Sequence, residues 1–237
     1  MKKSVFMILL AAVLLLASGC NTFKDTPETD AAFSAYEAAI RKAVEHRKGS
    51  ISVVTQNKDT IDNTESLGVI EYSFTTDEAG KVSFERNDFT NGEPVAAYYA
   101  DGSAAYQMNM ETGEWVDVTE DSKDMLTHGT NYMNTLSLFR IDNHFRYSKH
   151  FYESVTLEQQ GEEQVVVFTL KNKAVSKMFS FSDEKPIRRT MAGHTRSYHL
   201  NAEGELYKIV IDTKQDVVYK GAEGTLTNRI TVEMNYD

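Results

Sequence analysis

The chain is poor in residues that would cross-link a fold or attract nucleic acid. Its 237 residues include one cysteine, three prolines and one tryptophan. A single cysteine excludes an internal disulfide, so the fold depends on its hydrophobic core, and a chain of this length can bury a large one. Lys and Arg number 25 against 35 Asp and Glu, a net charge of −10. This balance repels nucleic-acid phosphates, and we expect no nucleic-acid partner.

Sequence patterns of common catalytic and metal sites are also missing. The chain has no G-x-S-x-G, no phosphate-binding P-loop and no H-E-x-x-H. We interpret the six histidines as scattered surface side chains, because zinc needs three or four converging ligands. His194 and His199 are five apart on an expected strand, so they are predicted to face opposite sides. We therefore expect neither an enzyme, nor a metal site, nor a cofactor.

The lone cysteine follows an export signal. Two lysines precede an apolar run from Val5 to Leu16, which is shorter than the about 20 residues that span a bilayer. This order is typical of a secretory signal peptide. The stretch from Leu16 to Cys20 resembles a bacterial lipobox, although Ala17 stands where leucine is commoner. The resemblance implies a diacylglycerol on Cys20, whereas the alternative is an ordinary cleaved signal with a chance cysteine.

These features predict three parts of the chain. Residues 1–19 form a lipoprotein signal peptide, residues 20–29 hold the lipidated cysteine and a flexible tether, and residues 30–237 form a single domain. Two or three acyl chains on Cys20 would hold the protein on a membrane, since each buried methylene contributes about 0.8 kcal/mol. The expected location is extracytoplasmic, on the bacterial cell membrane.

A long helix is expected at the start of the domain. It begins at Pro27 or Asp30 and runs to Lys48, with Thr26 as its N-cap and Gly49 as its stop. Apolar residues three or four apart give it one buried face, namely Phe33, Tyr36, Ile40 and Val44.

The rest of the chain alternates between apolar and polar residues, which predicts antiparallel strands. Hairpin loops are expected at residues 76–80 and 201–204, and a two-residue type I′ turn at Asp101-Gly102. Helical spacing also predicts a second helix over 122–139 and a short third one within 171–182. The fold class is therefore α+β: a strongly curved antiparallel sheet, or half-barrel, of about ten strands with two or three helices on its concave face.

One hairpin carries a resemblance to a known group. The run from Tyr98 to Tyr106, with Asp101-Gly102 at its centre and Trp115 following, resembles a hairpin of the LolA/LppX-like half-barrel bacterial lipoproteins of Gram-positive type. The long hairpins around Gly80 and Gly204 are similar too. The resemblance implies an unclosed barrel whose concave face holds acyl chains or another hydrophobic ligand. Related members carry lipids or lipoproteins across an envelope, or sense mislocalised lipoprotein.

We therefore expect a membrane-anchored lipoprotein that binds a lipid or acyl chain in its concavity, as carrier or sensor. The alternative is an envelope lipoprotein that docks another envelope protein and has a filled core. Aromatic and aliphatic side chains on the apolar faces are the candidates for the ligand lining: Tyr72, Phe74, Phe84, Tyr106, Tyr132, Leu136, Phe139, Phe168 and Ile209.

Overall fold

The computed structural model describes residues 26–120, 151–173 and 187–237, which contain one long helix and eleven strands. The helix is α2 (Pro27–Glu45). The strands are β1 (Lys48–Asp59), β2 (Thr64–Thr76), β3 (Val82–Thr90), β4 (Glu93–Asp101), β5 (Ala105–Met108), β6 (Trp115–Asp117), β7 (Tyr152–Gln160), β8 (Glu163–Leu170), β9 (Ile187–Leu200), β10 (Leu206–Tyr219) and β11 (Ala222–Tyr236).

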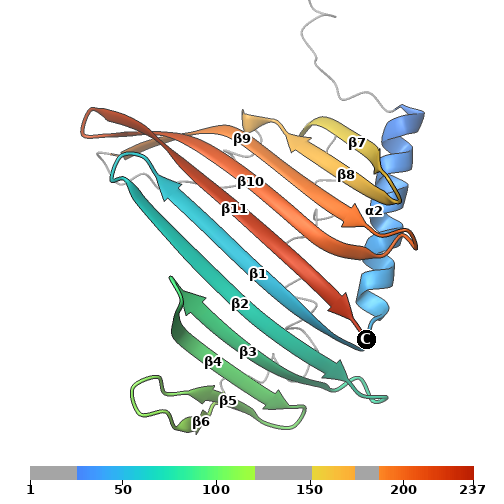
Figure 1. The fold of residues 1–237 in the computed structure, drawn as a ribbon, viewed down its shortest axis with the longest axis vertical. Helices are drawn as coiled ribbons and strands as arrows, with labels where there is room; N and C mark the ends of the chain where they lie inside the picture. The colour runs from blue at the N-terminus through green and yellow to red at the C-terminus, as the bar shows by residue number, and fades with distance from the viewer. Residues whose placement is uncertain (1–25, 121–150, 174–186) are drawn as a thin grey trace, which may run out of the picture.

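All eleven strands belong to one antiparallel sheet (Figure 1). Its order is β6-β5-β4-β3-β2-β1-β11-β10-β9-β8-β7, so two meanders meet where β1 pairs with β11. The edge strands β6 and β7 do not pair with each other in this order, and the sheet stays open. The predicted antiparallel, unclosed sheet is confirmed, and it is one layer rather than two stacked sheets.

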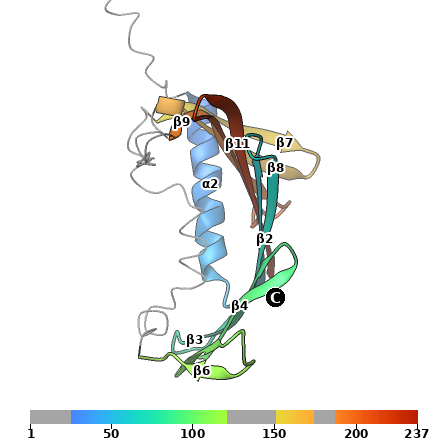
Figure 2. The ribbon, with the colours of Figure 1, turned by 90° about the vertical axis from the view of Figure 1, so that its left-hand side faces the viewer.

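The sheet is curved, and α2 lies on its concave side (Figure 2). From β2 towards β6 the sheet bends under the end of the helix (Figure 2). The described part has one helix with assigned bounds, rather than two or three. Of the further helices expected from the sequence, 122–139 lies outside the described residues, and so does 171–182 except for residues 171–173.

The first helix begins where the sequence predicts. Thr26 is the N-cap, and its Oγ1 accepts a hydrogen bond from the backbone N–H of Thr29 at 3.3 Å. The helix ends earlier than expected, at Glu45, because the chain turns to extended backbone at His46. Gly49 is therefore not a helix stop. It lies in β1, where a Cβ would stand 2.5 Å from the carbonyl oxygen of Asn235, so the close approach of β11 requires glycine there.

The hairpin between β4 and β5 also differs from the expected type I′ turn. Such a turn needs positive φ at both central residues, and in Asp101-Gly102 only Gly102 has it, at 83°. Ala100 pairs with Ala105, so four residues form the loop. The Asp101 carboxylate organises this loop by accepting hydrogen bonds from the backbone N–H groups of Ser103 and Ala104, each at 2.9 Å.

Candidate functional site

The concave face of the sheet is the main candidate site. Alternate residues of a strand point to opposite faces, and cross-strand partners share a face. The pairs Val53 with Val232 and Val53 with Ile70 therefore place one apolar row on the concave face across β11, β1 and β2. The face is continuous from β5 to β8, and its members form a single buried cluster.

One end of the concave face carries a group of aromatic rings on β2 and β3. Tyr72 stacks on Phe84 with ring centroids 5.5 Å apart, and on Phe74 at 6.1 Å. All three side chains are buried. Phe74 pairs with Phe84 across the two strands, so this register brings the rings together. The strand register thus places Tyr72, Phe74 and Phe84 on the concave face; that they contact a ligand stays a prediction.

The helix covers another part of the concave face. It packs against β7, β8 and β10. Tyr36 meets Tyr198 and Phe168 edge-to-face, with centroids 4.7 and 5.2 Å apart. Phe168 and Ile209, both predicted lining residues, are fully buried in this region. Each edge-to-face pair adds about 0.5–1.5 kcal/mol to the stabilisation that comes from burying apolar surface. The part of the concave face under α2 is therefore a firmly packed core.

The prediction for Tyr106 is wrong. Tyr106 pairs with Tyr99 and stacks on it at 5.6 Å, while the neighbouring pair Ala100 and Ala105 is buried on the concave side. Tyr106 therefore lies on the convex face, where it is half-buried. Aromatic character suggested a core residue, but the register through the hairpin decides the face. The remaining candidates lie outside the described residues, namely Cys20, Tyr132, Leu136 and Phe139.

A buried polar group borders the apolar cluster of the concave face on β9 and β10. Arg196 Nε donates to His194 Nε2 at 3.1 Å, and His194 Nδ1 lies 3.0 Å from Thr213 Oγ1. Since Nε2 accepts from a guanidinium, the imidazole is neutral, its proton is on Nδ1, and Nδ1 donates to the threonine hydroxyl. Burial, aided by the Arg196 charge, lowers the pKa of His194 to about 4.

This group corrects the interpretation of the histidines as surface side chains. His194 is only 3% exposed. It shares its face with Tyr198, four residues on, whereas His199 lies on the opposite face as predicted. Burial and the nearby Lys208 lower the pKa of His199 as well. Strand parity relative to Tyr198 was the sequence feature that could have placed His194 in the core.

A row of small polar side chains continues from this group across the sheet. Asn228 Nδ2 donates to Asn57 Oδ1 at 2.7 Å, and Asn57 Nδ2 donates to Ser66 Oγ at 3.3 Å. Thr213 pairs with Asn228, so the row crosses β9, β10, β11, β1 and β2 on the concave face. The concave face is therefore amphipathic, apolar near α2 and polar towards the hairpin between β10 and β11.

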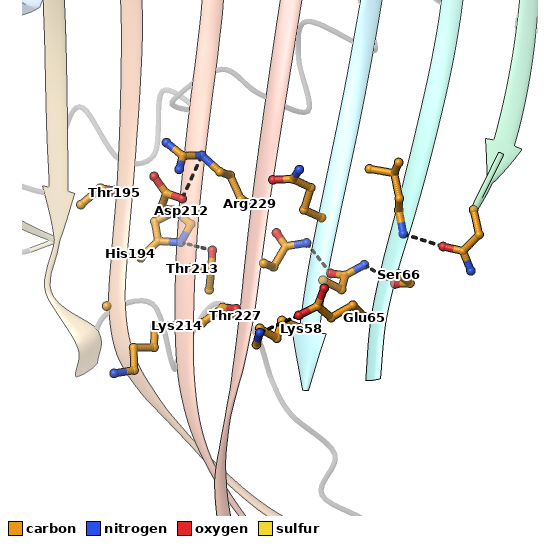
Figure 3. Close-up of a pocket in the computed structure, with 16 residues that line it drawn as sticks. Lys58, Glu65, Ser66, His194, Thr195, Asp212, Thr213, Lys214, Thr227 and Arg229 are labelled. Atoms are coloured by element: carbon orange, nitrogen blue, oxygen red, sulfur yellow. Dashed lines mark hydrogen bonds and ion pairs between the residues drawn. The ribbon is translucent and has the colours of Figure 1, made fainter. Parts of the chain in front are cut away.

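The convex face behind this row has a shallow groove of about 770 Å³ (Figure 3). Two ion pairs lie in its walls: Arg229 Nε is 3.5 Å from Asp212 Oδ1, and Lys58 Nζ is 2.6 Å from Glu65 Oε1. Exposed pairs of this kind contribute about 0–1 kcal/mol and are screened by salt. The groove has the chemistry of a solvated sheet face, and we assign no ligand to it.

In residues 26–120, 151–173 and 187–237, no three or more His, Cys, Asp or Glu side chains cluster in a way that could hold a metal ion. In the same ranges, no helix has both the length and the apolar character needed to cross a membrane.

The sequence matches no family model and no curated protein. Solved structures similar to this one include LprF of Mycobacterium bovis, with a TM-score of 0.41 and 10% identity over 86% of this chain and 92% of that one. The lipoprotein LppX of Mycobacterium tuberculosis follows with a TM-score of 0.37 and 10% identity, over 89% and 95%. The comparison also finds a Vibrio parahaemolyticus domain named for outer membrane lipoprotein sorting, with a TM-score of 0.27 and 6% identity, over 87% and 93%.

These proteins come from the group that the sequence resembles. At these identities and TM-scores, neither a residue's role nor a ligand is carried from them to this chain. The placement of the concave face rests on the pairing of the strands described above.

Proposed function

We propose that this chain is a membrane-tethered extracytoplasmic lipoprotein that binds a lipid or another hydrophobic ligand in the concavity of its half-barrel. The observation that carries the proposal is the single, curved, open sheet whose concave face carries one large buried apolar cluster. Its role is binding rather than catalysis. An acyl chain needs only a dry concave surface, and each buried methylene stabilises the complex by about 0.8 kcal/mol.

The two halves of the concave face have different parts in the proposal. The rings of Tyr36, Phe168 and Tyr198 pack tightly between α2 and the sheet and hold the helix in place. The stacked group of Tyr72 and Phe84 lies on strands beyond the β7, β8 and β10 surface that carries the helix. We place the acyl chain along this second half, where it would lie against aromatic faces and aliphatic side chains.

The polar row favours an amphiphile over a pure hydrocarbon. Asn57, Asn228 and Ser66 offer amide and hydroxyl groups next to the apolar surface. A ligand with its tail against the rings and its polar end at this row would leave few polar groups unpaired, which matters because each buried, unpaired group costs about 1–3 kcal/mol.

Tethering has its own test. Replacing the predicted lipid acceptor, Cys20→Ser, should move the protein from the membrane fraction to the soluble fraction and abolish incorporation of labelled fatty acid. Unchanged membrane association of this variant would contradict the anchor, while leaving the proposal for the concave face intact.

Ligand binding is tested on the same Cys20→Ser protein. We expect organic extracts of the purified protein to contain a lipid by mass spectrometry, and a dansyl-labelled fatty acid to bind saturably. Ile70→Thr, which puts a hydroxyl on the concave face, should weaken probe binding a few-fold, while Tyr106→Ala on the convex face should leave it unchanged. A protein that yields no lipid and takes up no probe would refute the proposal.

The alternative, a protein-docking lipoprotein with a filled core, is favoured by the complete burial of Tyr152, Phe168 and Tyr198. The same assay separates the two functions, because a filled interior takes up no probe while the fold stays intact by circular dichroism.

A further inference from the structure

A patch of aromatic side chains lies on the convex face at the β6 edge of the sheet. Tyr99 and Tyr106 pair across β4 and β5 and stack, and Trp115 meets Tyr99 edge-to-face at 6.3 Å. Met108 pairs with Trp115 on the same face. We call these four residues the aromatic patch. Trp115 is 47% exposed and Tyr99 36% exposed, so their rings are open to solvent.

Carboxylates stand at both ends of the patch. Glu85 pairs with Tyr99 on the β3 side, and Asp117 pairs with Tyr106 on the β6 side. Both side chains therefore point to the convex face beside the rings. From residue 82 to 117 the chain contains seven Asp and Glu residues against a single Arg.

That one arginine lies on the other face and already has partners. Arg86 forms a bidentate pair with Asp88, with Nε to Oδ1 and Nη2 to Oδ2 both at 2.7 Å. Its guanidinium also lies 5.6 Å from the ring centroid of Tyr98. The concave face of the same strands thus holds a cation between a carboxylate and a tyrosine ring. The convex patch presents the same two groups, Glu85 beside Tyr99 and Asp117 beside Tyr106.

We propose that the aromatic patch binds a Lys- or Arg-rich segment of a partner protein. Cationic side chains would lie over the rings of Tyr99, Tyr106 and Trp115, where the negative ring faces attract them. Glu85 and Asp117 would pair with the same or neighbouring cations. This interaction is independent of the lipid site, because it uses the opposite face of the sheet.

Charge and position favour a Lys- or Arg-rich segment over two other occupants, an anionic lipid surface and a second copy of this chain. An acidic patch repels both an anionic lipid surface and the same patch of a second copy of this chain. The patch also lies at the opposite end of the molecule from the start of α2 at Pro27, the end nearest the predicted tether (Figure 2). In a tethered protein the patch would face away from its own membrane, towards other proteins.

The experiment uses the fluorescence of Trp115, the only tryptophan of the chain, as a reporter within the patch. An oligo-arginine peptide should change this fluorescence saturably at about 0.15 M salt, and an oligo-glutamate peptide should not. Removing the two carboxylates, Glu85→Gln with Asp117→Asn, should weaken binding about five- to tenfold. Replacing the rings, Tyr99→Leu with Tyr106→Leu, should weaken it about three- to tenfold.

A matched control removes the same charge elsewhere. Glu153 and Glu223 are exposed and lie outside β3 to β6. Glu153→Gln with Glu223→Gln should leave peptide affinity within about twofold of the parent, since distant exposed charges are screened. Equal weakening by this control would mean attraction to overall charge and would overturn the proposal. Three further results would also overturn the proposal. They are the absence of saturable peptide binding, a preference for phosphatidylglycerol vesicles over the oligo-arginine peptide, and self-association that the ring variants abolish.

Discussion

Lowering the pH should destabilise the fold through His194, and it should do so at pH values well above those at which carboxylates titrate. The pKa of His194 is about 4 in the folded protein, against an ordinary value of 6.5. A histidine with a lowered pKa binds its proton more readily in the unfolded chain. The stability that the neutral imidazole contributes is therefore fully present above pH 6.5. It is lost as the pH falls towards 4, the pKa of His194 in the folded protein. The loss amounts to about 2 kcal/mol at pH 5 and about 3 kcal/mol at pH 4.

The structure gives the reason for this magnitude. An imidazolium at His194 cannot accept the hydrogen bond that Arg196 Nε donates to Nε2, and it would place a second cation 3.1 Å from the guanidinium nitrogen. Burial away from water adds to the cost.

The assay is urea unfolding of the parent and the His194→Gln variant between pH 8 and pH 4.5. The parent should lose about 2 kcal/mol of unfolding free energy between pH 8 and pH 5, and the variant, which has no imidazole, much less. An equally steep loss in both proteins would refute the reasoning, because other groups would then carry the pH dependence. The lowered pKa of Asp101, about 2, acts below this window and is common to both proteins.

Two stability predictions follow from close packing. Gly49→Ala should cost about 1–3 kcal/mol, because its Cβ would stand 2.5 Å from the carbonyl oxygen of Asn235. Gly193→Ala, with no atom within 4 Å of a Cβ, is the matched control and should stay within about 0.5 kcal/mol of the parent by urea unfolding. Phe168→Ala should cost about 3–5 kcal/mol and lower the urea midpoint, as expected for a fully buried ring. Val116→Ala on the exposed edge strand should leave the midpoint nearly unchanged, and equal shifts in both variants would contradict the assignment of the core.

Local patterns predicted much of the fold. The helix face that contains Tyr36 and Ile40 follows from apolar spacing, and both residues are buried. The N-cap at Thr26 follows from its residue type beside Pro27. Each of these features depends on residues close in the chain, so periodicity and capping chemistry were enough to find them.

The candidate site was only partly predictable. Tyr72 and Phe74 alternate with polar residues within β2, so the sequence predicts that they share a face, whereas the pairing of β2 with β3 brings Phe84 to the same face. Tyr106 was misplaced because residue type says nothing of which face a strand position occupies. His194 was misread because its hydrogen bonds to Arg196 and Thr213 depend on the pairing of β9 with β10.

By itself the sequence determined the helix, the alternating strands and the acidic, disulfide-free character of the chain, because these depend on composition and near-neighbour spacing. Only the tertiary structure decided that β1 pairs with β11, which joins two meanders into one open sheet and places Gly49 against Asn235. In the same way, the pairing of β9 with β10 places the His194 group on the concave face, and the pairing of β4, β5 and β6 places the aromatic patch on the convex face. Such contacts join residues far apart in the chain, and strand register, which no local pattern encodes, determines which side chains meet.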